Sequence, residues 1–437
     1  MRQFMVRATR CAAVAAAAAL ALALTAAVAQ AACVNPGGTR GCYASIQDAI
    51  DNTAAGGRVV IRPGRCRQQF AVTKSLLIAG GGGGPAAVLI DGDHAAVTAG
   101  ILAPDVRLDN LTLWNAGTNL VVSLAENTRI TRSILRGAGG PCVLAAGTGA
   151  GIAKTSISLC DGQGVVAGGA DFLMQASRVT RADGNCVQVG AANARVLGNR
   201  LRSCADDGIE ITGSNALVRG NQVRQTAFEG IVVTGTSAEV RSNVVDGTGN
   251  FGINVISSGP TVAGNSVTNT INSAIRVSCS ACTGASVVNN TAAWGSSWGF
   301  EILATGALNS LVAGNQARGF KNHGFLLGGN GPFTLRRNAA REIQGNCYTL
   351  DATVLGVLAE RNRALSCSED AFRVGSDSAT LKGNAARGAN IGFHVMFGAA
   401  SASLDANTAT GNSYAFCDDT AAATISSNSF TASLCPP

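Results

Sequence analysis

Acidic side chains gather in one stretch of the chain at spacings that suit two kinds of chemistry. Asp206, Asp207 and Glu210 lie close together, and Glu229 follows Asp207 after 22 residues. Two carboxyl groups held roughly 5–9 Å apart can act as the acid and the base of a glycosidase. Carboxylate oxygens are also the ligands that Ca²⁺ prefers. We therefore predict that Asp207 and Glu229 form either a catalytic pair or, together with Asp183, a calcium site.

Further residues could hold a sugar beside these acids. An arginine can pair with the carboxylate of a uronic acid, and a tryptophan can stack on the apolar face of a sugar ring. The predicted catalytic residues are Asp207, Glu229, Asp206 and Arg276. The predicted substrate-binding residues are Trp298, Trp294, Glu210 and Asp183. A purely structural interpretation stays open, because Asp before Gly is an ordinary turn former and recurs at 161–162, 183–184 and 207–208.

The acids stand on a repeat that indicates which elements must position them. Residues 218–233 and 240–255 read VRGNQVRQTAFEGIVV and VRSNVVDGTGNFGINV, with matching residues 22 apart. The Asn of this repeat recurs every 21 to 25 residues along most of the chain. The full series is Asn199, Asn221, Asn243, Asn265, Asn290, Asn315, Asn338, Asn362, Asn384, Asn407 and Asn428, with Ser177, Ser156 and Ser133 in the same place upstream.

A second series of mostly apolar residues runs in step with the first. Asp207 and Glu229 each stand two residues before one of its members. A period in the low twenties, with strand-like alternation and no helical stretch, predicts a β-solenoid rather than helical repeats. The series is Val143, Val165, Val187, Ile209, Ile231, Ile253, Ile275, Phe300, Phe325, Thr349, Phe372, Phe393 and Phe416.

In such a solenoid each repeat is one coil of three short strands, and the coils stack about 4.8 Å apart. Stacking buries the apolar series in one continuous core. The recurring Asn amides can hydrogen-bond from coil to coil, so we assign them a structural role. Residues 45–51 form an amphipathic segment with Ser45 as N-cap, and we expect this short helix to cover the open end of the core.

The N-terminal residues have the features of an export signal. Arg2, Arg7 and Arg10 precede an Ala-rich apolar run, and we predict that residues 1–29 are a signal peptide removed before Gln30. An uncleaved anchor stays open as an alternative. Loss of three arginines lowers the net charge from +7 to +4, which gives no argument for nucleic acid as a partner. We expect a secreted protein with no membrane attachment after cleavage.

Fourteen cysteines agree with an oxidising compartment. Their spacing predicts the disulfides Cys142–Cys160, Cys186–Cys204, Cys279–Cys282, Cys347–Cys367 and Cys417–Cys435. A zinc site is the competing interpretation of the CxxC at 279–282, but neither a second CxxC nor a neighbouring His completes a ligand set. Cys33, Cys42 and Cys66 cannot all pair with one another, so one of them is left over.

Three features together resemble a known family: SIQDAIDNTAAGGRVVIRPG at 45–64, LLIAGGGGGPAAVLIDG at 76–92, and the Gly-Asn-x-Val coils. They are similar to the pectin-lyase-like superfamily of right-handed parallel β-helices. The resemblance implies an all-β fold, a single-stranded right-handed parallel β-helix with a short N-terminal capping helix. Residues 30–115 would form the cap and first coils, and residues 116–437 the remaining coils of the same domain.

The resemblance fixes the activity less well than the fold, because the superfamily contains lyases, glycosidases, epimerases and secreted proteins of unknown role. The motifs Asn-Thr-Asp, Gly-His-Gly and Asp-Pro-His-Asp of its better-known enzymes are missing here. One expectation is a monomeric extracellular protein that binds or cleaves a polysaccharide or cell-surface glycan, such as a polyuronate, by lyase- or hydrolase-type chemistry, with Ca²⁺ as the candidate cofactor. The alternative is a non-catalytic structural or adhesion solenoid at the cell surface. Whether the chain is an enzyme stays open.

Overall fold

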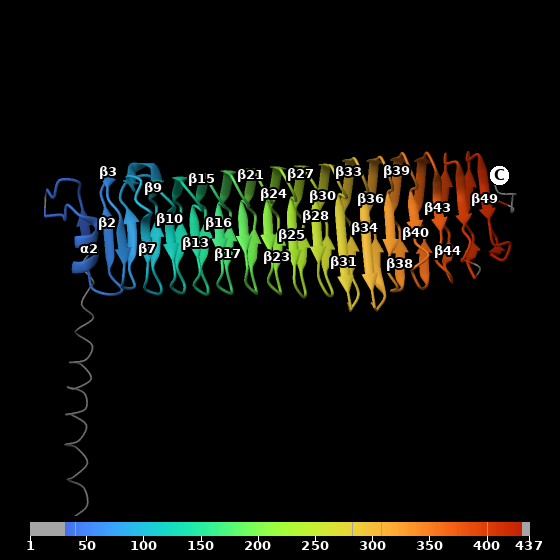
Figure 1. Ribbon diagram of the computed structural model, residues 1–437, viewed down its shortest axis with the longest axis horizontal. Helices are drawn as coiled ribbons and strands as arrows, with labels where there is room; N and C mark the ends of the chain where they lie inside the picture. Colours follow the sequence, from blue (N-terminus) through green and yellow to red (C-terminus); the bar gives the residue numbers. More distant parts are fainter. Residues whose placement is uncertain (1–30, 40, 282, 307, 400, 431–437) are drawn as a thin grey trace, which may run out of the picture.

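Each repeat folds into one coil of three short parallel strands joined by turns. In the coil that carries Asp207 these are β20 (Arg195–Leu197), β21 (Arg200–Cys204) and β22 (Ile209–Ile211). The computed structural model describes residues 31–39, 41–281, 283–306, 308–399 and 401–430, so the predicted signal peptide lies outside the described part. The coils stack in chain order into a long rod (Figure 1).

Stacking produces three parallel sheets that run along the rod. Among the described residues sheet A has 18 strands, and sheets B and C have 16 strands each. The predicted all-β, right-handed parallel β-helix is therefore confirmed. The first and last strands are β1 (Ala32–Val34) and β50 (Thr424–Ser426) in sheet A, β3 (Gly64–Arg67) and β48 (Thr408–Thr410) in sheet B, and β4 (Phe70–Val72) and β49 (Tyr414–Asp418) in sheet C.

Inward side chains of sheet C form the column that the apolar series predicted. Ile209 pairs with Val187 on one side and Ile231 on the other, and all three are buried. Toward the C-terminus the column becomes a stack of parallel rings 4.7–4.9 Å apart, made of Phe300, Phe325, Tyr348, Phe372 and Phe393. Thr349 was predicted in this column, but Tyr348 occupies it, because β40 (Tyr348–Leu350) aligns one residue earlier than the spacing indicated.

The Asn series forms a continuous buried ladder in the turn between sheets A and B. Asn221 donates from its backbone N–H and its Nδ2 to Oδ1 of Asn243, at 2.9 and 3.0 Å, and its Nδ2 also donates to a backbone carbonyl. The same bonds repeat through Asn428. Upstream, Ser177 and Thr155 continue the ladder, so the prediction of Ser156 is wrong by one residue. Each Asn side chain satisfies the hydrogen-bonding groups of the next one, which removes the penalty of about 1–3 kcal/mol for an unpaired buried amide.

The N-terminal end of the core is closed by helix α2 (Ile46–Asn52). Ser45 is its N-cap, and Ser45 Oγ accepts the backbone N–H of Asp48 at 3.2 Å. Ile46, Ala49 and Ile50 are buried in the same core as the first strands, which confirms the predicted cap. In the described part of the chain, no helix is long and apolar enough to cross a membrane.

Disulfides link neighbouring coils at the corner between sheets B and C. Three predicted pairs are present, Cys142–Cys160, Cys186–Cys204 and Cys347–Cys367. Cys279 and Cys417 are also disulfide-bonded, but Cys282 and Cys435 lie outside the described residues. Cys33 pairs with Cys42, which leaves Cys66 unpaired, and burial raises the pKa of its thiol. These bonds fit a protein that folds in an oxidising compartment.

Candidate functional site

The predicted acids lie along one edge of sheet C, in the turn that leads into each of its strands. Asp207 and Glu229 hold the same place in successive coils, before β22 and β25 (Ile231–Thr234). Asp207 Oδ1 accepts the backbone N–H of Glu229 at 2.9 Å, and Asn185 Oδ1 accepts that of Asp207 at 2.8 Å. These side chains form a second ladder outside the core, in which one coil caps a backbone N–H of the next.

The environment of Asp207 favours its protonated form. Burial, a side-chain hydrogen bond with Glu229, and the charges of Glu229 and Asp206 together raise the pKa of Asp207 to about 8, while the backbone N–H of Glu229 opposes them. Glu229 therefore acts on Asp207 through its side chain, its charge and its backbone N–H, as expected for two acids at the same position of neighbouring coils. The carboxyl pair therefore favours retention of a proton near neutral pH.

Neutral amides extend this pair in both directions along the edge. Asn185 Nδ2 and Gln188 Nε2 donate to Glu210 Oε2 at 2.6 and 2.9 Å. On the other side Asn250 Nδ2 donates to Glu229 Oε1 at 2.9 Å. Glu210, predicted to bind substrate, thus lies on the same face as the pair, with its carboxylate held by two amides.

Arg276 belongs to a separate cluster, two coils beyond Glu229 and so about 10 Å along the rod. Its Nε lies 3.5 Å from Glu301 Oε1 but makes no hydrogen bond with it, and its guanidinium lies 5.2 Å from the ring centre of Phe251. Ser273 Oγ donates to Glu301 Oε2 at 2.8 Å. Arg276 is on the predicted face but is engaged with Glu301 and not with the carboxyl pair.

The two tryptophans predicted to bind substrate lie on different faces of the rod. Trp298 precedes β34 (Phe300–Thr305) of sheet C, is half-buried, and stacks on His323 with ring centres 6.5 Å apart. Trp294 lies in β33 (Thr291–Gly295) of sheet B, is 51% exposed, and packs under the guanidinium of Arg318. Trp298 therefore shares the face of the carboxyl pair, and Trp294 does not.

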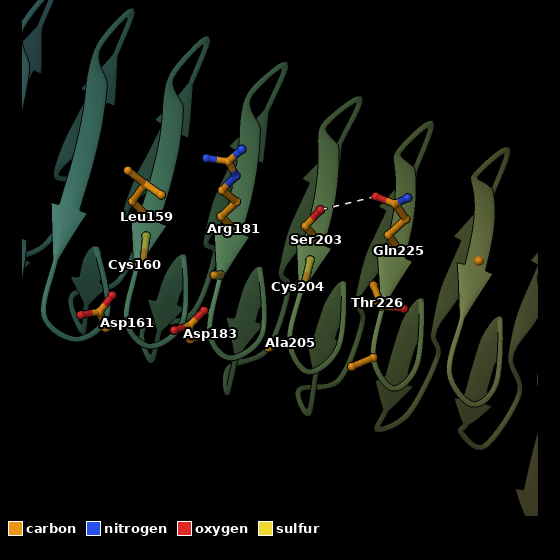
Figure 2. A pocket seen from close by; sticks show the side chains of 13 residues that line it. Leu159, Cys160, Asp161, Arg181, Asp183, Ser203, Cys204, Ala205, Gln225 and Thr226 are labelled. Atoms are coloured by element: carbon orange, nitrogen blue, oxygen red, sulfur yellow. Dashed lines mark hydrogen bonds between the residues drawn. The ribbon is translucent and has the colours of Figure 1, made fainter.

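Asp183 lines a groove that neither Asp207 nor Glu229 lines. This groove has a volume of about 760 Å³ and lies at the corner between sheets B and C, where Asp183 stands on a turn next to the one that carries Asp161 (Figure 2). No three carboxylate, imidazole or thiol ligand atoms from Asp183, Asp207 and Glu229 come within 4.8 Å of one another in the described chain. In the described residues these three side chains do not converge as a compact ligand set, and the calcium site stays a prediction.

The described residues do contain one group with ligand atoms within 4.8 Å, namely His394, Cys417 and Asp419. Cys417 is disulfide-bonded and has no thiolate to offer a metal. His394 instead bridges two carboxylates, with Nδ1 2.8 Å from Asp370 Oδ2 and Nε2 3.2 Å from Asp419 Oδ2. The hydrogen bond with Asp370 and the charges of Asp370 and Asp419 raise the pKa of His394, although burial of the ring lowers it. This group is an ionic link between the last coils.

A pocket further along sheet C was missed by the sequence reasoning. It encloses about 380 Å³ and is lined by His323, Glu369, Arg373, Thr349 and the exposed Phe397. Burial is the largest cause that lowers the pKa of His323; Glu369 raises it and Arg373 lowers it. Thr349 Oγ1 is buried without a partner among the described residues. The one-residue misalignment at Thr349 hid the convergence of these side chains.

Comparison with known proteins identifies the family of the chain. The family model for the right handed beta helix region matches residues 86–245 and 229–354, more than half of the chain. The chain belongs to this family. No curated protein matches it. Membership settles the fold but not the chemistry, since one fold hosts many functions.

Several solved structures are similar to the chain at low sequence identity. The chain is similar to the A-module of a mannuronan C-5 epimerase of Azotobacter vinelandii, with 14% identity and a TM-score of 0.42 over 90% of this chain and 94% of that one. It is also similar to a periplasmic alginate epimerase, with 11% identity and a TM-score of 0.35 over 88% and 78% of the two chains. A pectate lyase gives 9% identity and a TM-score of 0.33 over 72% and 78%. Likenesses at this level carry no argument about activity.

Proposed function

We propose that this chain is an exported polysaccharide-binding protein that hydrolyses glycosidic bonds at the outer face of sheet C, with Asp207 as the proton donor. The observation that carries the proposal is the placement of Asp207 and Glu229 at the same position of successive coils on the edge of sheet C, joined by the bond from the Glu229 backbone N–H to Asp207 Oδ1. Burial and Glu229 also raise the pKa of Asp207 to about 8, which favours its protonated form. A general acid is most effective when its pKa lies near the working pH. Glu229 sustains that protonation by its hydrogen bond and charge.

In the proposed step Asp207 gives its proton to the glycosidic oxygen while the bond from that oxygen to the anomeric carbon breaks. Water adds to the anomeric carbon, and the proton it loses returns to the carboxyl pair. The products are two shorter chains, and the pair regains its starting protonation. The step needs neither a metal nor a redox partner.

The rest of the face supplies groups that suit an extended chain. Trp298 stacks on His323 on the same face, and the pocket at His323 lies four coils beyond Glu229, about 19 Å along the rod. Arg373 in that pocket could pair with the carboxylate of a uronic acid. A polymer of several sugars would reach from the carboxyl pair to this pocket.

The second candidate function is a scaffold without catalysis, and a specific observation favours it. Asn185 and Asn346 use Oδ1 to accept a backbone N–H of the next coil, and Asp207 does the same with its own Oδ1. Asp207 would then be a capping residue whose proton has no chemical task.

A product screen separates the two candidates. The purified chain is incubated with polyuronates and neutral glycans, with and without Ca²⁺, and new reducing ends and unsaturated products are measured. Hydrolysis predicts reducing ends without unsaturation, lost at least a hundredfold in Asp207→Asn, which keeps the capping oxygen. Unsaturated products would indicate a lyase, and a calcium requirement would support the metal site. No products from any substrate would favour the scaffold.

A further inference from the structure

A groove lined by arginines lies on the outer face of sheet B, away from the carboxyl pair on sheet C. It has a volume of about 460 Å³. Its side chains come from strands β12 (Ile134–Ala138), β15 (Ser156–Cys160), β18 (Arg178–Ala182) and β21. The residues that matter here are Arg136, Ser158, Arg178, Thr180, Arg181 and Arg202.

The strand register places these residues in an ordered row. Arg136, Ser158, Thr180 and Arg202 pair in turn across four successive strands. Arg136 and Arg202 are therefore three coils apart, about 14 Å along the rod, with two hydroxyl groups between them. The two serine and threonine side chains are half-buried, whereas both arginines are exposed. The row has cations at its ends and hydrogen-bonding groups on its floor.

Two more arginines widen the positive charge at the middle of the row. Arg178 and Arg181 belong to β18, on either side of Thr180, and both are exposed. Arg181 is directed along the strand, away from Asp161 and Asp183, which lie on the turns (Figure 2). The groove thus places four guanidinium groups within a few coils of one another.

These positive charges are not neutralised by acids. Within the described residues, none of the four arginines lies within 4.0 Å of a carboxylate oxygen. The contact of Arg202 is neutral: its Nε donates to Gln225 Oε1 at 2.9 Å, which orients the guanidinium and leaves its other N–H groups available. Four unpaired cations in a groove create a positive potential that favours an anionic ligand.

We infer that this groove binds an acidic polysaccharide that lies along the axis of the rod. Successive coils rise by about 4.8 Å, comparable with one sugar ring, so the row can meet a charge that repeats along a polymer. Arginine binds carboxylate and sulfate groups through paired N–H donors, and Ser158 and Thr180 can bond sugar hydroxyls. The residues that line the groove include no aromatic side chain, but the exposed Trp114 pairs with Arg136 on the next strand, so the test also includes a nucleic acid. The disulfides also indicate an oxidising compartment.

The test compares two triple variants with the same change in net charge. The groove variant is Arg136→Gln, Arg178→Gln and Arg202→Gln. The matched control replaces three exposed arginines of sheet A, Arg195→Gln, Arg219→Gln and Arg336→Gln. The full chain and both variants are titrated with alginate and polygalacturonate at several salt concentrations, and with DNA and anionic phospholipid vesicles in parallel. Circular dichroism checks that all three proteins fold alike.

We expect the groove variant to bind the polyuronates at least tenfold more weakly, with a shallower salt dependence, while the control changes less than threefold. The inference is overturned if the unaltered chain does not bind the polyuronates, or if both variants weaken equally. It is also overturned if DNA or vesicles bind more tightly than the polyuronates through the same arginines. Because the groove lies on another sheet, this test of binding is independent of the test of hydrolysis at Asp207.

Discussion

The outer faces of sheets B and C belong to the same coils, but their charged side chains differ in burial and in ion pairing. On sheet C the ionisable groups are half-buried and joined to one another, as in the Asp207–Glu229 and Arg276–Glu301 pairs. On sheet B the arginines of the groove are exposed and unpaired in the described chain. Partly buried groups shift their pKa values and suit proton transfer, whereas exposed ones keep ordinary charge and suit binding of a polyanion.

The largest effect on stability is expected when one ion pair on sheet C is broken, and the matched control breaks an ion pair on sheet B. Glu301 is 9% exposed and pairs with Arg276, so Glu301→Ala leaves a half-buried cation and Ser273 without a partner. We expect a loss of about 3 kcal/mol in the free energy of unfolding. The matched change on sheet B, Glu342→Ala, removes an exposed partner of Arg318 and should cost about 0.5 kcal/mol or less. Urea midpoints measure both, and equal shifts would contradict the comparison.

The next effect is the pH dependence of the carboxyl pair. The pKa of Asp207 is raised to about 8 in the folded chain, so its contribution to stability is complete below pH 3.8 and is lost as the pH rises through 8. Asp207→Asn should remove this loss, making the variant more stable than the unaltered chain at pH 9 by up to about 2 kcal/mol after solvent screening. Thermal unfolding from pH 4 to pH 9 tests the sign. A variant less stable at pH 9 would disprove it.

A smaller pH effect is expected at the last coils. The pKa of His394 is raised by Asp370 and Asp419, so its contribution is complete below pH 6.5 and is lost as the pH rises through the raised value. We expect His394→Gln to lower the free energy of unfolding by about 1 kcal/mol at pH 5.5 and by less at pH 9. A loss independent of pH would indicate a packing role only. Hydrogen exchange in β46 (Ile391–Val395) and β49 localises the effect.

The smallest effect on stability is expected at the arginine groove. Arg202 is exposed and bonds only a neutral amide among the described residues, so Arg202→Gln should change the free energy of unfolding by less than about 0.5 kcal/mol. Its affinity for polygalacturonate should nevertheless fall severalfold, since one guanidinium is lost from the row. Calorimetric titration and thermal unfolding of the same sample give both numbers. A large loss of stability would show that the arginine has a structural role.

The fold could be predicted from the sequence because the constant spacing of the repeat shows which residues of successive coils stack on each other. Asn221 and Asn243 are 22 residues apart and stack one above the other, as predicted. Errors occurred where this regularity weakens, at Ser156 in place of Thr155 and at Thr349 in place of Tyr348. A polar residue next to another polar residue, or an aromatic next to Thr, does not reveal which one faces inward.

Part of the candidate site could be predicted from the sequence. The same spacing that stacks Ile209 on Ile231 also brings Asp207 beside Glu229. It did not show that Trp294 faces another sheet than Trp298, although only four residues separate them. Trp294 has a left-handed backbone, with φ of 59°, at the corner where the chain leaves sheet B. Such a turn redirects side chains in a way that spacing along the chain does not express.

The sequence by itself determined the coil, its period and the columns of residues that lie one above another, because parallel stacking converts a constant spacing into vertical alignment. Beyond such vertical neighbours, the tertiary structure decided how outward side chains pair and how deeply they are buried. The partners of Arg276, the protonation of Asp207 and the open groove at Arg202 depend on burial and on contacts between coils. Those quantities arise only when neighbouring coils exclude water from between them.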